Sequence, residues 1–155
     1  MAWHDVVIAF DTETTGLKGD AEIVEIGIVQ YYKGQRVREW SSFFCPRLAR
    51  FDDPDVQKAL ESNQIDWNVL VGTAPTFRKV VEEVERELSE AVWVAHNAEF
   101  DMRMLRQEFE RLERPMSFQP EIVLCTKCLD VVLSPNQESY ALSSVTQRWG
   151  VTPDG

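Results

Sequence analysis

The stretch Val6-Val7-Ile8-Ala9-Phe10-Asp11-Thr12-Glu13-Thr14-Thr15-Gly16 decides the fold of this chain and points to its chemistry. Its apolar, β-branched start, closed by the turn-forming Gly16, predicts a buried strand. Residues two apart on a strand face the same side, so Asp11 and Glu13 are expected to point together. Two converging carboxylates repel each other unless a cation lies between them, and oxygen ligands suit a hard divalent ion such as Mg²⁺ or Mn²⁺. The stretch therefore indicates a metal-dependent enzyme.

A second group of polar residues strengthens this interpretation, because an isolated Asp-x-Glu is often only a solvated turn. The apolar run Val92 to Ala95 predicts a strand, and His96-Asn97-Ala98-Glu99-Phe100-Asp101 leads from it into a helix with apolar residues at helical spacing. Asn97 is the expected N-cap. Asp101 then lies near the first turn, where the helix dipole favours an ionised carboxylate. It offers a third metal ligand.

The rest of the chain is typical of one α/β domain. Two strand-like runs, 22–32 and 37–45, are separated by the hairpin signal Lys33-Gly34-Gln35-Arg36. Further elements are expected as a short helix near 55–61, the only one in 46–75, a helix over 76–90, a strand at 91–95, and a later helix, short strand and two helices. The order predicts a mixed central sheet of three antiparallel strands plus parallel strands, flanked by helices. In such sheets, sites form beyond the carboxyl ends of strands.

The motifs resemble those of a known family. Phe10 to Gly16, Val24-Glu25-Ile26-Gly27 and His96 to Asp101 are similar to the first two exonuclease motifs of the DnaQ-like, or DEDD, 3′–5′ exonucleases, and the resemblance extends over essentially all 155 residues. It implies a ribonuclease-H-like fold in which the first and fourth strands lie side by side. Asp11, Glu13 and Asp101 would then form one cluster.

The resemblance also implies an activity, a cofactor and partners. The expected reaction is hydrolysis of the phosphodiester at the 3′ end of single-stranded DNA or RNA, with release of nucleoside monophosphates, as in DNA proofreading or repair. Two Mg²⁺ or Mn²⁺ ions are expected, with Asp11 bridging both, Glu13 holding the ion nearer the nucleophile and Asp101 holding the other. A polymerase or another protein is a further expected partner.

Five residues are expected to contact the terminal nucleotide, again by resemblance. Thr12 and Thr14 would offer backbone or hydroxyl donors, Leu17 would wedge against the base, and Asn97 and Phe100 would line the same pocket. A plain core role is an equal alternative for Phe100. Glu25 is expected either to support the metal ligands or to be a salt-bridged residue at a sheet edge.

One departure from the family concerns the third motif. The family carries a fourth metal-binding Asp, and a general-base His or Tyr shortly before it, on a helix after a segment that resembles Leu142 to Gly150. Here no His or Tyr follows Gly150, and Asp154 is the only carboxylate there. We therefore expect residues 1–155 to form a single exonuclease domain that lacks its C-terminal catalytic helix and is catalytically crippled at this length. The alternative is a catalytically incomplete exonuclease-fold interaction module.

Composition limits the possible roles further. The chain has 44% hydrophobic residues, enough for one core, and lacks both a long apolar span and a secretory leader, which predicts a cytoplasmic protein with no membrane contact. The net charge of −10 has the wrong sign for diffuse attraction to long nucleic acids. The exonuclease hypothesis needs only a few phosphates at one strand end. Arginines at 47, 50, 103, 106, 111 and 114 are available, although most are expected on solvated faces.

Two other chemistries are open at the sequence level. Asp11 to Thr15 loosely resembles the Asp-x-Asp-x-Thr motif of aspartate-phosphoryl hydrolases, in which Asp11 would be a nucleophile. Cys125-Thr-Lys-Cys128 has the local order of a thioredoxin-like redox site. We favour structural or incidental cysteines, because thiols are among the most buried side chains and Cys125 follows the strand Glu121 to Leu124, which is expected to be buried.

Overall fold

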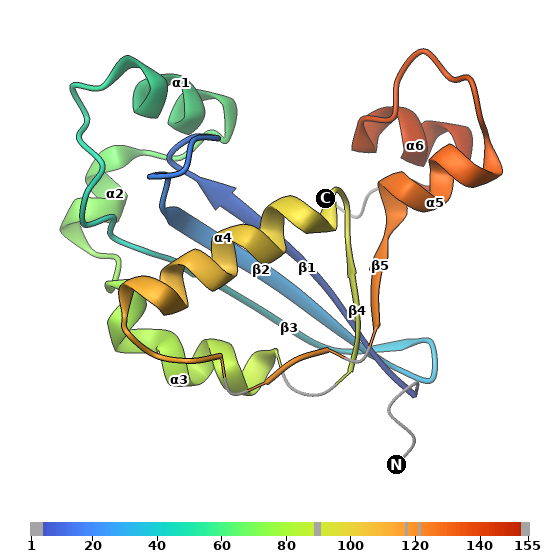
Figure 1. Ribbon diagram of the computed structural model, residues 1–155, viewed down its shortest axis with the longest axis horizontal. Helices are drawn as coiled ribbons and strands as arrows, with labels where there is room; N and C mark the ends of the chain where they lie inside the picture. Colours follow the sequence, from blue (N-terminus) through green and yellow to red (C-terminus); the bar gives the residue numbers. More distant parts are fainter. Residues whose placement is uncertain (1–4, 89–90, 117, 121, 153–155) are drawn as a thin grey trace.

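A computed structural model describes residues 5–88, 91–116, 118–120 and 122–152 of the chain. Its eleven elements are arranged as a central sheet with helices around it (Figure 1). They are β1 (Val6–Thr14), β2 (Ile23–Tyr32), β3 (Gln35–Phe43), α1 (Pro54–Ser62), α2 (Trp67–Gly72), α3 (Phe77–Glu87), β4 (Val92–Ala95), α4 (Ala98–Arg111), β5 (Ile122–Cys125), α5 (Thr126–Leu133) and α6 (Leu142–Arg148).

The sheet has the strand order β3-β2-β1-β4-β5. The first three strands pair antiparallel, and β4 and β5 add in parallel, which confirms the predicted mixed sheet. The β2–β3 hairpin turns at Lys33 and Gly34, whose φ angles are 49° and 78°. Positive φ at both central residues is the geometry that matches the twist of a two-residue hairpin. The predicted hairpin signal is thereby explained.

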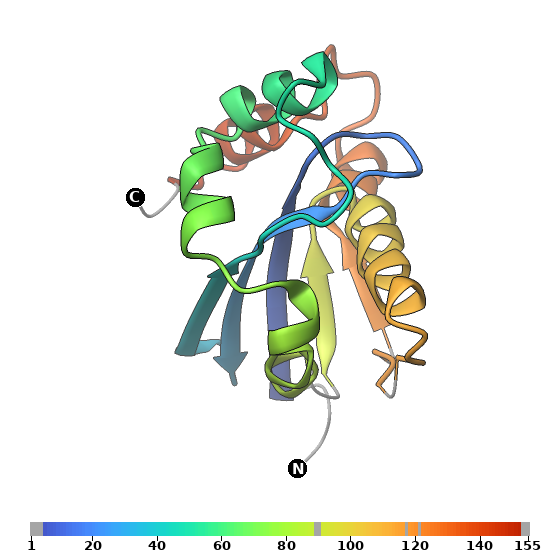
Figure 2. The ribbon, with the colours of Figure 1, turned by 90° about the vertical axis from the view of Figure 1, so that its left-hand side faces the viewer.

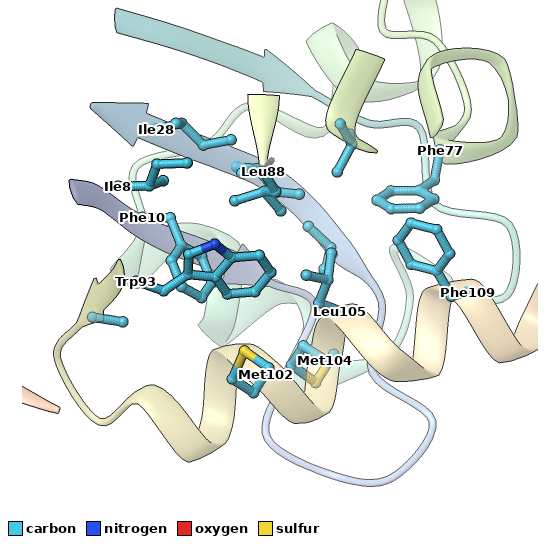
Figure 3. Packing of buried hydrophobic residues seen from close by; sticks show 14 of the residues in the cluster. Ile8, Phe10, Ile28, Phe77, Leu88, Trp93, Met102, Met104, Leu105 and Phe109 are labelled. Carbon is cyan, nitrogen blue, oxygen red and sulfur yellow. The ribbon is translucent and has the colours of Figure 1, made fainter. Parts of the chain in front are cut away.

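One face of the sheet carries the hydrophobic core, and helices α3 and α4 lie over it (Figure 2). Aromatic rings from strands and helices interlock there: Phe10 meets Trp93 with ring centroids 5.2 Å apart, and Phe77 meets Phe109 at 5.8 Å (Figure 3). Edge-to-face contacts of this kind add specificity to the burial of large apolar area. The core fixes α4 across the strands that carry both motifs.

The opposite face of the sheet is much less buried. Along β1, residues such as Ile8 and Phe10 are buried against α4, whereas the alternating residues, including Asp11 and Glu13, are half-buried or exposed. The strand period of two therefore places these two carboxylates together, as predicted, on the side of β1 opposite Phe10 and Thr12.

An apolar surface extends over β5, α5 and α6. Its large exposed side chains are Ile122, Val123, Leu124, Leu129, Val131, Val132, Leu133, Leu142, Trp149 and Val151. The expectation of a buried strand before Cys125 is wrong for Ile122 to Leu124, each of which is more than one-third exposed. An apolar run predicts a strand but does not tell which faces are covered. We call this set of residues the C-terminal apolar surface.

The segment 46–75 holds a second helix that was not predicted. Asp66 caps α2, its side chain accepting from the Asn68 backbone N–H, and Leu70 anchors the helix by complete burial. Six residues give too short a periodic pattern to recognise in sequence. The sequence Pro153-Asp154-Gly155 is typical of a turn, and it lies outside the described residues. Among the described residues, no helix has the length and apolarity needed to cross a membrane.

Candidate active site

Four carboxylates converge where β1 and β2 approach the start of α4. Asp11 and Glu13 lie on β1, and Glu25 lies directly opposite Glu13 in the antiparallel pairing with β2. The parallel pairing of β1 with β4 brings in α4, which follows β4 and carries Asp101. Glu25 is on an interior strand, so the alternative of a salt-bridged edge residue is wrong. We call Asp11, Glu13, Glu25 and Asp101 the site carboxylates.

Asp101 is held in place by β1. Its side chain is only 2% exposed, and its Oδ1 accepts hydrogen bonds from Thr12 N at 3.0 Å and Thr12 Oγ1 at 2.7 Å. Asn97 is the N-cap of α4, as predicted, in the left-handed conformation with φ 67° and with no side-chain capping bond. The tight turn at Asn97 sets Asp101 into the first turn of α4, where it meets Thr12.

Burial raises the proton affinity of the site carboxylates, and repulsion from neighbouring carboxylates adds to this for Asp11 and Glu13. Burial raises the pKa of Asp11 to about 6, with the negative charges of Asp101 and Glu25 adding to the effect, although much of the Asp11 residue is open to solvent. The pKa of Glu13 rises to about 7 because of burial and the charges of Asp11 and Glu25. Burial also raises the pKa of Asp101 and of Glu25. A bound cation would favour the ionised forms of these carboxylates and would relieve the repulsion around Asp11 and Glu13.

The positive charge that acts on this cluster comes from His96, which opposes the burial-driven rise in the pKa of Asp101. No ion pair found among the described residues involves Asp11, Glu13, Glu25 or Asp101. Within the same described ranges, no three acidic, His or Cys side chains already stand at metal-binding geometry. The all-oxygen donor set nonetheless fits a hard divalent ion, since such ions prefer carboxylates.

A cavity of about 880 Å³ opens beside the cluster, between the residues that follow β1 and helix α1. Glu13 and Thr14 line it together with Leu17, which is 79% exposed, and Phe100. This volume suits a nucleotide-sized ligand. Asn97 does not line this cavity, and its Oδ1 accepts instead from Lys127 Nζ at 3.4 Å.

The two threonine hydroxyls are already engaged within the protein. Thr12 Oγ1 donates to Asp101, and Thr14 Oγ1 donates to the Gly16 carbonyl at 2.7 Å. Sequence reasoning assigned both residues to the nucleotide. The structure gives Thr12 the further task of orienting Asp101, which depends on a tertiary contact that no sequence spacing reveals.

Sequence reasoning missed the contacts that hold the loop of residues 16–20. Side chains one helical turn apart on α4 donate to its carbonyls: Arg103 to Leu17 at 3.5 Å, Gln107 to Gly19, and Arg111 to Asp20 at 2.9 Å. The spacing of four residues along α4 was the available signal. These contacts fix the wall of the cavity that carries Leu17.

The arginines considered as phosphate ligands are largely used internally. Arg50 pairs with Asp52 at 3.0 Å, Arg111 with Glu108 at 2.6 Å, and Arg114 with Glu85 at 2.5 Å. Arg103 lies over the Phe100 ring, 5.2 Å from its centroid. Acidic partners within the fold thus account for three of the six arginines.

The cysteines of the Cys-x-x-Cys segment lie near the second motif. Cys125 is half-buried, Cys128 is exposed, and both are free thiols. Burial would raise the pKa of Cys125, but backbone N–H groups of Cys128 and Ala98 outweigh it and lower that pKa. Burial of the preceding strand was the argument against redox chemistry, and that argument fails. The absence of redox activity therefore stays a prediction.

The chain is similar to known proteins over nearly its whole length. The model of the exonuclease family matches residues 8–155. DNA polymerase III subunit epsilon of Treponema pallidum (strain Nichols) is 33% identical over 153 residues, which cover 96% of this chain and 67% of that protein. The 3′-5′ exonuclease DinG of Staphylococcus aureus (strain MRSA252) is 31% identical over 98% of this chain but only 16% of its own length. The chain thus spans about two-thirds of one relative and a small part of the other.

Solved structures agree with the sequence matches. Exonuclease X in complex with 5′ overhanging duplex DNA is 27% identical, with a TM-score of 0.70 over 96% of this chain and 78% of that chain. The nuclease domain of 3′hExo, a DEDDh family member bound to rAMP, has a TM-score of 0.78 at 15% identity, covering 99% and 83%. These matches confirm the predicted ribonuclease-H-like sheet flanked by helices.

Proposed function

Because this chain belongs to the exonuclease family, we propose that it is the catalytic part of a 3′–5′ exonuclease. The substrate is the 3′ end of single-stranded DNA or RNA, and the products are nucleoside monophosphates. The observation that carries the proposal is that the site carboxylates lie beside a nucleotide-sized cavity. The pKa values of two of them, Asp11 and Glu13, are raised. An aspartate-phosphoryl hydrolase would give Asp101 no role, so that alternative is set aside.

The site carboxylates hold the metal in this proposal. Asp11, Glu13 and Asp101 are the ligands, and Glu25 strengthens the negative field around Asp11 and Glu13. A bound Mg²⁺ or Mn²⁺ pair supplies an activated water and stabilises the leaving oxygen. Thr12 keeps the Asp101 carboxylate oriented through its two hydrogen bonds.

The cavity receives the terminal nucleotide. Leu17, which is highly exposed, packs against the base, and Phe100 lies in the same cavity. Apolar contact with a base face tolerates any sequence, which suits digestion of unselected strands. Thr14 offers its backbone, whereas Asn97 lies at the start of α4 outside this cavity and is assigned no contact with the nucleotide.

A helix that carries the fourth Asp and a His or Tyr base completes the enzyme in this proposal. The C-terminal apolar surface supports it, because Val132 (76%), Leu133 (64%) and Trp149 (52%) are large apolar side chains exposed on or next to α5 and α6. Surfaces of this kind usually contact another element or protein. We propose that a segment following residue 155 packs near this surface and brings the base to the water.

The test is digestion of a 5′-labelled single strand in Mn²⁺. The expected result is stepwise shortening from the 3′ end with mononucleotide products, arrest by EDTA, and slower digestion of a 3′-phosphorylated strand. Turnover should be orders of magnitude higher for a chain extended through the proposed helix, because members of a catalytic unit act together. Internal cuts, or digestion from the 5′ end, would refute the proposal.

An interaction module is the second candidate. The favouring observation is that no three metal-ligand side chains stand preassembled in the described part of the chain. Likeness to DNA polymerase III subunit epsilon makes a polymerase the proposed protein partner for either candidate. The module reading requires equal, negligible turnover for both chain lengths, whereas the enzyme reading requires a rise on extension.

A further inference from the structure

Glu22 is a buried carboxylate that stands outside the site carboxylates. It lies between β1 and β2, is only 3% exposed, and forms no ion pair among the described residues. Instead, its Oε1 accepts from Arg47 N at 2.8 Å, and its Oε2 accepts from both Leu48 N and Ala49 N at 2.7 Å. Hydrogen bonds to a charged acceptor are about twice as strong as neutral ones. One side chain thus fixes three successive amides.

These three amides depend on Glu22. No other acceptor for the N–H groups of Arg47, Leu48 and Ala49 is found in the part of the chain that the structure describes. The segment 47–49 has neither helical nor strand bonding of its own. Loss of the Glu22 carboxylate would therefore free this segment.

Glu22 also binds the loop that follows β1. Its backbone N–H donates to Thr15 Oγ1, and its carbonyl accepts from Thr15 N, both at 2.9 Å. Thr15 lines the cavity, as do Leu48, Ala49 and Arg50. A single residue therefore ties the wall that carries Leu17 to the wall that carries Leu48.

Leu48 is an unusual surface residue. Its side chain is 61% exposed although its backbone is anchored, and it lines the same cavity as Leu17. Two exposed leucines on the walls of one cavity provide apolar contact for a flat ring entering between them. The loop that presents Leu48 has no helical or strand hydrogen bonds of its own, and the Glu22 carboxylate stabilises its conformation.

We propose that Glu22 is a positioning residue for substrate, and that it presents Leu48 to the cavity as a second apolar contact for the terminal base. The inference rests on the proposed function for the identity of the ligand. It assigns Glu22 no contact with substrate or metal.

The test compares three single variants of the 155-residue chain. Glu22→Gln keeps the size of the side chain but turns an NH₂ group toward amides that need an acceptor. Leu48→Ala removes the apolar contact and leaves the anchor intact. Glu87→Gln is the matched control, because Glu87 is a buried carboxylate too, paired with Arg38 at 2.6 Å and absent from the cavity wall.

Two measurements separate the anchor from the contact. Amide hydrogen exchange at residues 47–49 should become about tenfold faster in Glu22→Gln, and unchanged in Leu48→Ala and Glu87→Gln. Calorimetry with Mn²⁺ and thymidine 5′-monophosphate should give about fivefold weaker nucleotide binding in Glu22→Gln and in Leu48→Ala, with no further loss in the double variant. Binding of 2-deoxyribose 5-phosphate, which lacks the base, should be unaffected.

Unchanged exchange at 47–49 in Glu22→Gln would overturn the anchor, and equal weakening of the baseless probe would overturn the base contact. If Glu22→Gln does not fold, Leu48→Ala with the two probes still decides the contact. A wild-type chain that binds neither probe refutes the proposed function together with the base contact. Faster exchange in Glu22→Gln would then show that the anchor stands alone.

Discussion

Two sets of carboxylates in this molecule are treated in opposite ways. Glu22, Glu87 and Asp130, which we call the paired carboxylates, are each at most 3% exposed and receive hydrogen bonds or ion pairs from the protein. The site carboxylates crowd together, and none of them is in an ion pair found among the described residues, although Asp101 is buried and accepts two hydrogen bonds from Thr12. Burial alone therefore does not mark function. What distinguishes the site is the crowding of carboxylates that are in no ion pair among the described residues.

The largest effect is expected on catalysis. Asp11→Asn or Asp101→Asn in a chain carrying the proposed C-terminal helix should reduce 3′-exonuclease turnover by roughly a thousandfold or more, because the ligands act as one unit. Turnover at saturating Mn²⁺ measures this. Glu110→Gln, an exposed carboxylate on α4, is the control and should keep full activity. If Asp11→Asn lost only tenfold or less in turnover, the site carboxylates would not differ in function from the paired carboxylates.

The next effect is on stability and concerns a paired carboxylate. Asp130 accepts from Trp149 Nε1 at 2.7 Å and pairs with Arg148, so it joins α5 to α6. Asp130→Ala leaves Arg148 without this partner and should lower the free energy of unfolding by roughly 3 kcal/mol. Urea denaturation of the wild type and the variant gives the value. A loss below about 1 kcal/mol would show that this pairing is not structural.

Among the site carboxylates we expect a smaller effect on stability, and of opposite sign: removing a charge should stabilise the protein. The folded-state pKa values of about 6 for Asp11 and about 7 for Glu13 exceed their ordinary values of 3.8 and 4.5, so the folded protein binds more protons than the unfolded chain. Metal-free stability should therefore fall as pH rises from about 4 to about 7, and level off above that window. Asp11→Asn should raise stability at about pH 8, by of the order of 1 kcal/mol, since solvent screens the exposed residue.

Thermal unfolding in EDTA across this pH range tests the sign. Added Mn²⁺ should stabilise the wild type more than Asp11→Asn and so cancel the gain in stability of the variant, because the ion needs the ionised carboxylate that the variant lacks. Wild-type stability that increases between pH 5 and 7 would contradict the repulsion described for Asp11 and Glu13.

The smallest effect on stability is expected from the contact between Thr12 of β1 and Asp101. Thr12→Val keeps the shape of the side chain but removes the 2.7 Å hydrogen bond to Asp101, leaving the backbone bond. The expected cost is about 1 kcal/mol of stability and a further rise in the pKa of Asp101. Carboxyl NMR titration measures the pKa. An unchanged Asp101 titration would show that Thr12 does not orient this carboxylate.

Much of the fold could be predicted, because it rests on local periodicity. The apolar runs predicted β1 and β4, and their adjacency brought Asp11 and Asp101 to one place. Helix α2 was missed because six residues are too few for a pattern, and the exposure of β5 was missed because periodicity does not say what covers a strand.

The site could be predicted less completely than the fold. Its charged residues were found because the carboxylates follow strands in recognisable motifs. The bond from Thr12 to Asp101, the engagement of Asn97 by Lys127, and the Glu22 anchor all join segments far apart in sequence. Such contacts follow from tertiary packing, for which single residues carry no local signal.

The most direct test of the central claim is calorimetric titration of the chain with Mn²⁺ at pH 6.5 and 8.5, each in two buffers of different ionisation enthalpy. If the site carboxylates hold the ion, binding at pH 6.5 releases protons from groups with pKa values of about 6 and about 7, so the observed heat depends on the buffer. At pH 8.5 the heat should not depend on the buffer, and Asp11→Ala should abolish binding while remaining folded. Undiminished binding in Asp11→Ala, or binding without proton release at pH 6.5, would contradict the account.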